Sequence, residues 1–151
     1  MGTTTFTGPI KAGDVLNTSG ATAGLIRNVG SCVMSQSSAL TQASTATATA
    51  TLICLPANSH ILSIDVAATV AWSGTDTLSV GTTTAANQLV AATSVSAVGI
   101  LALSPGTDAT RTAKWIDVGT DDVIIYVDSG SAGDGVGVLT ITYVQAENLT
   151  A

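Results

Sequence analysis

The stretch that decides the fold runs from Leu55 to Thr82, LPANSHILSIDVAATVAWSGTDTLSVGT. Its middle alternates almost without a break, and successive side chains of a strand point to opposite faces, so it predicts a long half-buried strand. The residues at 73–76 have turn chemistry and those at 78–80 resume the alternation, which predicts a hairpin. The predicted inward face of the first strand consists of Leu62, Ile64, Val66, Ala68, Val70 and Trp72.

The composition of the chain favours an all-β fold. Of its 151 residues, 46% are hydrophobic, only 3% are aromatic and only 9% are charged. Thr and Val suit a half-buried pleated surface, whereas Glu, Lys and Arg, which are common in soluble helices, are scarce here. A surface with so little charge also indicates that other protein covers part of it, because soluble monomers usually carry more charge.

The charge balance argues against nucleic acid and membrane partners. The formal net charge is −6, and the basic residues Lys11, Arg27, Arg111 and Lys114 are spread along the chain. Affinity for nucleic acid comes largely from Lys and Arg at the phosphates, so we expect no DNA or RNA binding. We expect no membrane partner either, because an anionic surface would repel the chain and no run of 18 apolar residues occurs. The N-terminus lacks the basic and apolar regions of a secretory signal.

Turn signals separate several further strand-like runs, which predicts antiparallel sheets packed as a sandwich or barrel. The glycine-rich residues 129–135 are predicted to form a hairpin loop, with Gly130, Gly133, Gly135 and Gly137 as hairpin glycines. The other candidate strands are residues 45–55 (which begin with an alternating Thr/Ala run), 87–92 and 95–103 (each with a weaker helical alternative), 114–118, 123–127 and 136–144.

Residues 1–30 differ from the rest of the chain. They contain six of the fifteen glycines and show no sustained alternation. Such a segment is either disordered or ordered against a partner, and its apolar residues favour the second. We therefore predict an extended N-terminal arm (1–30) before a β-sandwich domain (31–151). The candidate contact residues of the arm are Phe6, Pro9, Ile10, Lys11, Val15, Leu16, Leu25, Ile26 and Arg27.

Candidate catalytic residues are few. The single histidine, His60, could pair with Asp65 or a serine, but a catalytic base needs a nucleophile in reach and no GxSxG motif occurs. We favour a surface histidine at the entry of a strand, and we expect no enzyme and no cofactor. Trp72 is predicted to lie in the core, while Trp115 is open to either a core role or stacking on a sugar.

Candidate metal ligands also have a plainer interpretation. Asp121 and Asp122, beside Asp128 and Asp134, are the ligand type that Ca²⁺ prefers, but they lack a calcium-loop spacing. Asp is an ordinary turn residue, so we favour turns over a metal. The two cysteines, Cys32 and Cys54, are either a disulfide or two small buried hydrophobic residues, and we favour the second interpretation for a protein made in a reducing cytosol.

Three segments together resemble the capsid decoration (cement) proteins of tailed double-stranded DNA bacteriophages: TFTGPIKAG (5–13), LPANSHILSIDV (55–66) and WSGTDTLSVGTT (72–83). The resemblance extends from Phe6 to about Val144. It implies a jelly-roll-like antiparallel β-sandwich that forms a homotrimer on the outer capsid surface of the virion, which is assembled in the host cytoplasm. There it would clamp neighbouring subunits of the major capsid protein, without active-site residues. The rival hypothesis is a receptor- or carbohydrate-binding β-sandwich of a phage spike or fibre.

Overall fold

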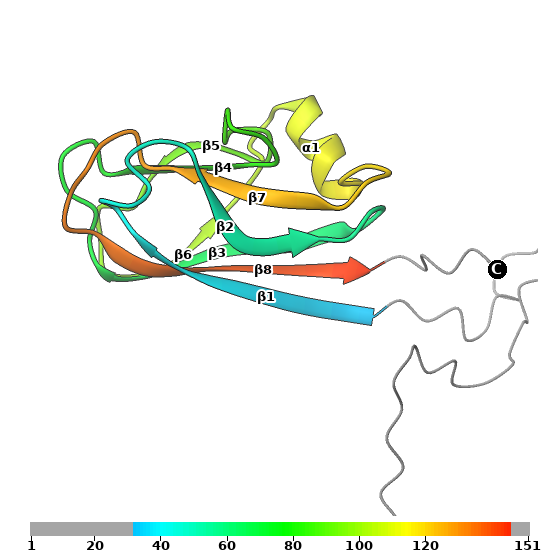
Figure 1. The fold of residues 1–151 in the computed structure, drawn as a ribbon, viewed down its shortest axis with the longest axis horizontal. Coiled ribbons are helices and arrows are strands. Elements are labelled where there is room, and N and C mark those ends of the chain that lie inside the picture. The colour runs from blue at the N-terminus through cyan, green and yellow to red at the C-terminus, as the bar shows by residue number, and fades with distance from the viewer. Residues whose placement is uncertain (1–31, 146–151) are drawn as a thin grey trace, which may run out of the picture. The chain divides into compact units, whose positions relative to one another are not determined.

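The computed structural model describes residues 32–145. The predicted arm, and with it the predicted boundary between arm and domain, lies outside the described residues. The described part of the chain forms eight strands and one short helix (Figure 1).

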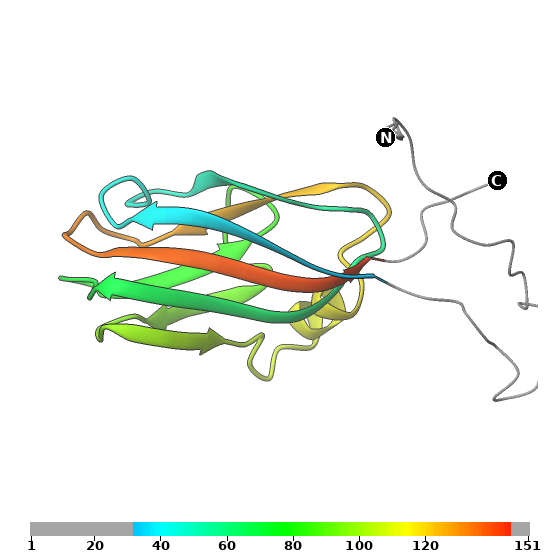
Figure 2. The same cartoon turned by 90° about the horizontal axis from the view of Figure 1, so that it is seen from below.

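The strands form two antiparallel four-stranded sheets that face each other across one core (Figures 1 and 2). Consecutive strands mostly alternate between the sheets, which is the strand order of a jelly roll. This confirms the predicted all-β antiparallel sandwich. Sheet A consists, in spatial order, of β1 (Cys32–Thr41), β8 (Val136–Gln145), β3 (His60–Val70) and β6 (Gly99–Leu103). Sheet B consists of β2 (Thr49–Leu55), β7 (Val123–Asp128), β4 (Thr77–Gly81) and β5 (Val90–Ser94).

Aliphatic side chains from both sheets fill the space between them. Ile64 and Val66 of β3 are fully buried, as are Leu78 and Val80 of β4, in agreement with the predicted alternation. The only large aromatic side chains fully or nearly fully buried among the described residues are Trp72 and Tyr143. Burying apolar surface in this way is the main favourable contribution to folding.

The predicted hairpin after the long strand is wrong. β3 belongs to sheet A and β4 to sheet B, so residues 71–76 cross from one sheet to the other. An alternating strand buries its apolar face equally well when the next strand lies opposite it, and alternation alone does not distinguish the two cases. Residues 129–135, predicted as a second hairpin, likewise cross from β7 in sheet B to β8 in sheet A.

A buried glutamine holds these crossings together. Gln42 is fully buried after β1, and its Oε1 accepts hydrogen bonds from the backbone N–H groups of Ser73 (2.9 Å) and Gly135 (3.2 Å). Its Nε2 donates to the carbonyl oxygen of Ser73 at 2.6 Å. One side chain thus satisfies backbone groups in both crossings, which buried polar groups require.

Two of the predicted inward residues of β3 point outward. Leu62 is 47% exposed and Val70 is 44% exposed. The pairing of β3 with β8 shifts register between Ile61 and Ser63 and again between Ala68 and Val70. A bulge inserts one extra residue and so reverses the alternation beyond it, which places Ile61 in the core instead of Leu62.

The predicted strand at 114–118 is also wrong. Residues Ala109–Ile116 form helix α1, which lies between β6 and β7. Asp108 is its N-cap, and the side chain accepts a hydrogen bond from the backbone N–H of Arg111 at 2.9 Å. No helix in the described part of the chain is long and apolar enough to cross a membrane.

The remaining predicted strands are largely confirmed. Residues 123–127 and 136–144 lie in β7 and β8, and the two apolar runs after residue 87 contain strands β5 and β6 rather than helix. The alternating Thr/Ala run divides: residues 42–47 are a turn, and β2 begins at Thr49. Thr45 lies in this turn, and its hydroxyl is buried against that of Ser129 at 2.5 Å.

Candidate interaction surface

The arm residues predicted to contact a partner (Phe6, Pro9, Ile10, Lys11, Val15, Leu16, Leu25, Ile26 and Arg27) all lie outside the described residues. The remaining candidates lie within them.

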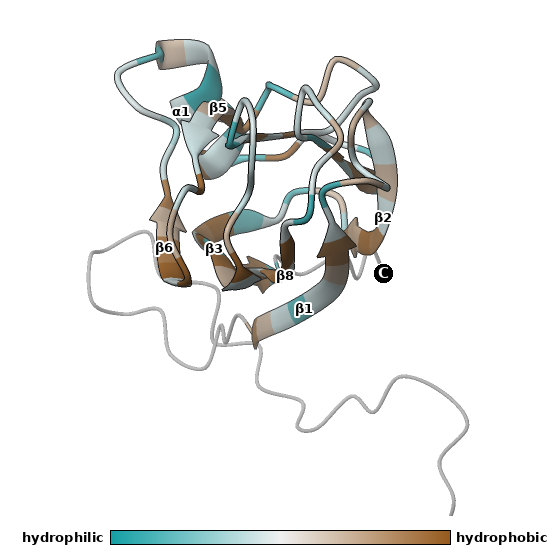
Figure 3. Cartoon of the chain, turned by 90° about the vertical axis from the view of Figure 1, so that its left-hand side faces the viewer, coloured by the Kyte–Doolittle hydropathy of each residue, from teal (hydrophilic) through white to brown (hydrophobic). Residues whose placement is uncertain are grey.

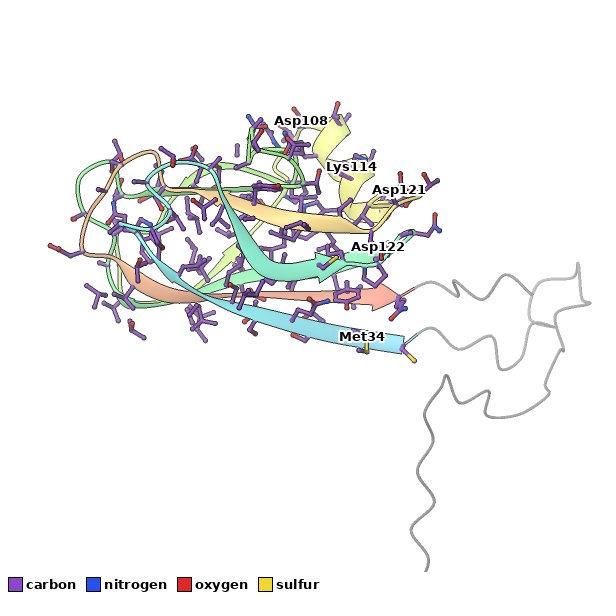
Figure 4. The ribbon with its side chains drawn as sticks, in the orientation of Figure 1. Met34, Asp108, Lys114, Asp121 and Asp122 are labelled. Atoms are coloured by element: carbon purple, nitrogen blue, oxygen red, sulfur yellow. The ribbon has the colours of Figure 1, made fainter. Side chains whose placement is uncertain are left out.

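The candidate calcium ligands do not come together. Asp121 and Asp122 precede β7, next to α1 (Figure 4), whereas Asp128 ends β7 and Asp134 follows it at the opposite end of the sandwich. The carboxylate of Asp122 accepts from the backbone N–H of Ala57 at 2.9 Å, and that of Asp128 accepts from Gly130 at 2.7 Å. Across residues 32–145, no three His, Cys, Asp or Glu side chains converge as a metal site would require. The carboxylates of Asp122 and Asp128 thus bind backbone N–H groups in turns.

The histidine and the tryptophans occupy structural positions. His60 is exposed at the first residue of β3, and Asp65 is half-buried five residues later on the same strand. Trp72 is buried and its indole N–H donates to the Ser129 hydroxyl at 3.0 Å, in agreement with its predicted core role. Trp115 packs half-buried against the core, and its indole N–H donates to the carbonyl of Leu89 at 3.0 Å.

Both cysteines are free and exposed, so the prediction that they are buried is wrong, as is the alternative of a disulfide. Cys32 is the first residue of β1, opposite Gln145, at the end of its sheet. Cys54 lies on β2 opposite Ile124, which is also exposed. Predicting that a cysteine lies in a strand does not tell whether its thiol faces the core or the solvent.

The outer face of sheet A carries a cluster of exposed apolar side chains. Val138 of β8 lies opposite Ala67 of β3, which in turn lies opposite Ile100 of β6, so the three form one row across the sheet. Ile100 is 81% exposed. Figure 3 shows the hydrophobic colour on β6, β3 and β8 side by side. We call this cluster the β6 patch; it consists of Val70, Val98, Ile100, Val136 and Val138.

The strands around this patch are almost free of charge. β1, β6 and β8 contain no Asp, Glu, Lys or Arg, and β3 contains only Asp65, which lies one row away from Ile100, opposite Thr140 and Ala102. Asp108 and Lys114 lie at α1, and Asp121 and Asp122 lie between α1 and β7 (Figure 4). Asp134 lies two residues before Val136, and Asp76 accepts a hydrogen bond from Ser94 at 3.0 Å.

The two long sides of the sandwich differ. On one side, the side-chain amide of Gln36 on β1 bonds the backbone of Cys54 on β2 and joins the two sheets. On the other side, β6 pairs only with β3 among the described residues, and a hollow of about 210 Å³ is lined by residues 94–101. β6 is thus an apolar edge strand without the charge, proline or bulge that usually protects such edges.

Two solved structures have a fold similar to that of this chain. A chain of the capsid of Ralstonia phage GP4 superposes with a TM-score of 0.55 at 20% sequence identity, over 80% of this chain and 88% of that one. A chain of the capsid asymmetric unit of cyanophage Pam1 superposes with a TM-score of 0.51 at 19% identity, over 87% of this chain and 97% of that one. The fold is one found in phage capsids. No protein-family model and no curated protein matches the sequence.

Sequence reasoning did not find the β6 patch. The run Val98–Leu103, VGILAL, is apolar at nearly every position, so its pattern does not show which of its side chains stay exposed. Its position at a sheet edge, with Ile100 outward, follows only from the pairing of β6 with β3. The low charge of the whole chain was the one sequence signal that pointed to a protein-contact surface.

Proposed function

We propose that this chain is a structural virion protein, a capsid decoration or cement protein, that binds the outer surface of the major capsid shell as a homotrimer and stabilises the head. It acts by contact, and no catalytic step is part of the proposal. Its partners are the major capsid protein and further copies of itself.

The observation that carries the proposal is the structural similarity to chains of two phage capsids. The superposition covers 88% and 97% of those chains, so it involves nearly the whole of each and not one shared motif. The jelly-roll sandwich of this chain is therefore similar in overall fold to chains found in two phage capsids.

The exposed surface supports a role in protein contacts. The outer face of sheet A is nearly free of charge and carries several exposed apolar side chains, a combination that marks protein interaction sites. In a trimer, three weak contacts with the shell reinforce one another through effective concentration. A decoration protein can thus hold a shell firmly without any single strong site.

We further propose that residues 1–30 dock on the shell and lock the trimer. An extended segment with spaced apolar residues, such as Phe6, Ile10 and Leu16, can lie in grooves or add a strand to a neighbouring sheet. Lys11 and Arg27 would then meet acidic groups on the partner. This part of the proposal rests on the sequence alone.

Binding to capsid shells tests the proposal directly. Shells of the major capsid protein from the phage that encodes this chain would be prepared without it and then mixed with the purified protein. We expect co-sedimentation that saturates in multiples of three copies, and electron-microscope density on the outer surface. Absence of binding at saturating protein, or density confined to the tail, would contradict the proposal.

A deletion separates the arm from the rest of the chain. Removing residues 2–24 should weaken binding to the shells, whereas replacing the same residues by a Gly/Ser segment of equal length controls for chain length. Undiminished binding of the deletion variant would contradict the arm assignment while leaving the capsid role intact. A glycan array, with and without Ca²⁺, tests the rival carbohydrate-binding function, and a strong specific signal there would favour that rival.

A further inference from the structure

We infer that the β6 patch is the surface through which copies of this chain contact one another. The inference rests on the proposed function for the number of copies, three, and it names the part of the fold that forms the contact. The occupant of the patch is therefore a second copy of this chain and not the capsid shell.

The patch is apolar, contiguous and exposed in the single chain. Ile100 is 81% exposed and Val98 is 66% exposed, and both come from the β5–β6 edge of the sandwich. Val138 lies in the same row as Ile100, and Val136 is paired with Val70 beside it. Covering side chains of this size removes apolar surface from water, which favours association.

The charge distribution indicates that the partner is another copy. Each copy carries a formal charge of −6, so identical chains repel unless they meet where charge is absent. Asp65 is the only acidic residue on the strands of sheet A, and it lies outside the row that contains Ile100. Contact through a face whose strands carry almost no charge keeps this repulsion between identical copies small.

The basic residues of the described region do not offset this repulsion near the patch. Arg111 forms an ion pair with Asp108 at 3.4 Å and donates to the carbonyl of Asn87 at 2.9 Å. Lys114 donates to the carbonyl of Val118 at 3.1 Å. Both belong to α1 and are already engaged within their own copy.

The open edge agrees with the same assignment. Gln36 closes the β1–β2 side of the sandwich, while within residues 32–145 β6 has no strand on its outer side. An uncharged edge strand such as Gly99–Leu103 tends to attract other chains unless it is covered. Specific contact between copies covers the edge and also removes this hazard.

The test compares two substitutions in the full-length protein without capsid shells. Ile100→Asp introduces a charge into the patch, and Val98→Asp repeats the change two residues away. Leu52→Asp is the matched control, because Leu52 is even more exposed (88%) but lies on β2 in the other sheet. Light scattering at micromolar concentration measures the mass, and thermal unfolding shows that each variant is folded.

We expect wild type and Leu52→Asp to have about three times the 14.9 kDa mass of one chain, and both patch variants to fall to the mass of one chain. A folded Ile100→Asp or Val98→Asp protein that keeps the wild-type mass would overturn the inference, as would dissociation caused by Leu52→Asp. A monomeric wild-type protein would also overturn it. Failure of wild type to bind shells, with the mass result as expected, would contradict the proposed function and leave this inference standing.

Discussion

The side-chain amide of Gln36 forms hydrogen bonds with both backbone groups of Cys54. Its Nε2 donates to the Cys54 carbonyl oxygen at 2.7 Å, and its Oε1 accepts from the Cys54 N–H at 3.0 Å. The same Nε2 also donates to the hydroxyl of Tyr143 at 2.7 Å. A carboxamide carries the same donor and acceptor as a peptide unit, so this side chain takes the place of a strand partner for β2 and fastens sheet A to sheet B.

Substituting Gln36 by Ala should lower the free energy of unfolding by about 1 kcal/mol. The reason is that the backbone N–H and carbonyl of Cys54, which lie near the surface, lose their hydrogen-bond partner. Gln36→Glu should be intermediate, since it keeps an acceptor for the Cys54 N–H but no longer donates to the carbonyl. Urea denaturation measures both differences. Wild-type stability in Gln36→Ala would show that water replaces the amide without cost.

The two faces of β3 can be distinguished by one pair of substitutions. Val66 is fully buried, so Val66→Asp should cost several kcal/mol and leave the protein unfolded. Leu62→Asp, on the same strand, should change stability by only about 0.5 kcal/mol, because Leu62 is 47% exposed beside a bulge. Circular dichroism and thermal unfolding provide the measurement. A folded Val66→Asp protein with an unfolded Leu62→Asp protein would reverse the assignment of the faces.

Gly135 is required by the ring of Trp72. A Cβ at residue 135 would lie 2.6 Å from Trp72 Cδ2, which is closer than side-chain atoms approach. We expect Gly135→Ala to destabilise the protein by about 1–3 kcal/mol through overpacking. Combining it with Trp72→Leu should cost less than the two changes added together, because the smaller side chain relieves the clash. Strict additivity in chemical denaturation would contradict this contact.

Asp108 should make helix α1 sensitive to acid. The hydrogen bond from the backbone N–H of Arg111, together with the nearby guanidinium, holds the pKa of Asp108 below its ordinary value of 3.8. A carboxylate with a lowered pKa in the folded state contributes stability that is present above the ordinary pKa and is lost as the pH falls through the lowered one. Thermal unfolding between neutral pH and pH values below this range should show a smaller acid-induced loss in Asp108→Asn than in wild type. An equal loss in both proteins would assign the acid dependence to other groups.

Both thiols should react in the native protein. Cys32 and Cys54 are free and exposed, so a thiol reagent should modify two groups per chain at mildly alkaline pH without denaturant. The single variants Cys32→Ser and Cys54→Ser should each retain one reactive group. Reaction only after denaturation would show that the thiols are covered, and no reaction without a reductant would show that they form a disulfide.

The amino-acid sequence by itself determined the fold class. Few charged residues, many Thr and Val, and alternating apolar runs are typical of half-buried strands in an antiparallel sandwich or barrel. The approximate positions of β3, β4, β7 and β8 follow from them. Trp72 is buried as predicted, although Val70, on the same predicted face, is exposed and Trp72 itself lies in the crossing after β3.

The tertiary structure alone decided which strands are neighbours and which faces stay exposed. Alternation shows that one face of a strand is buried, but not which sheet the next strand joins. Residues 71–76 could therefore form a hairpin or a crossing between sheets. They form a crossing, and the buried side-chain amide of Gln42 binds its backbone at Ser73. Bulges move Leu62 and Val70 outward because one inserted residue reverses every side chain beyond it. Ile100 is exposed because β6 lies at an edge, and edge position depends on long-range pairing that no local pattern encodes.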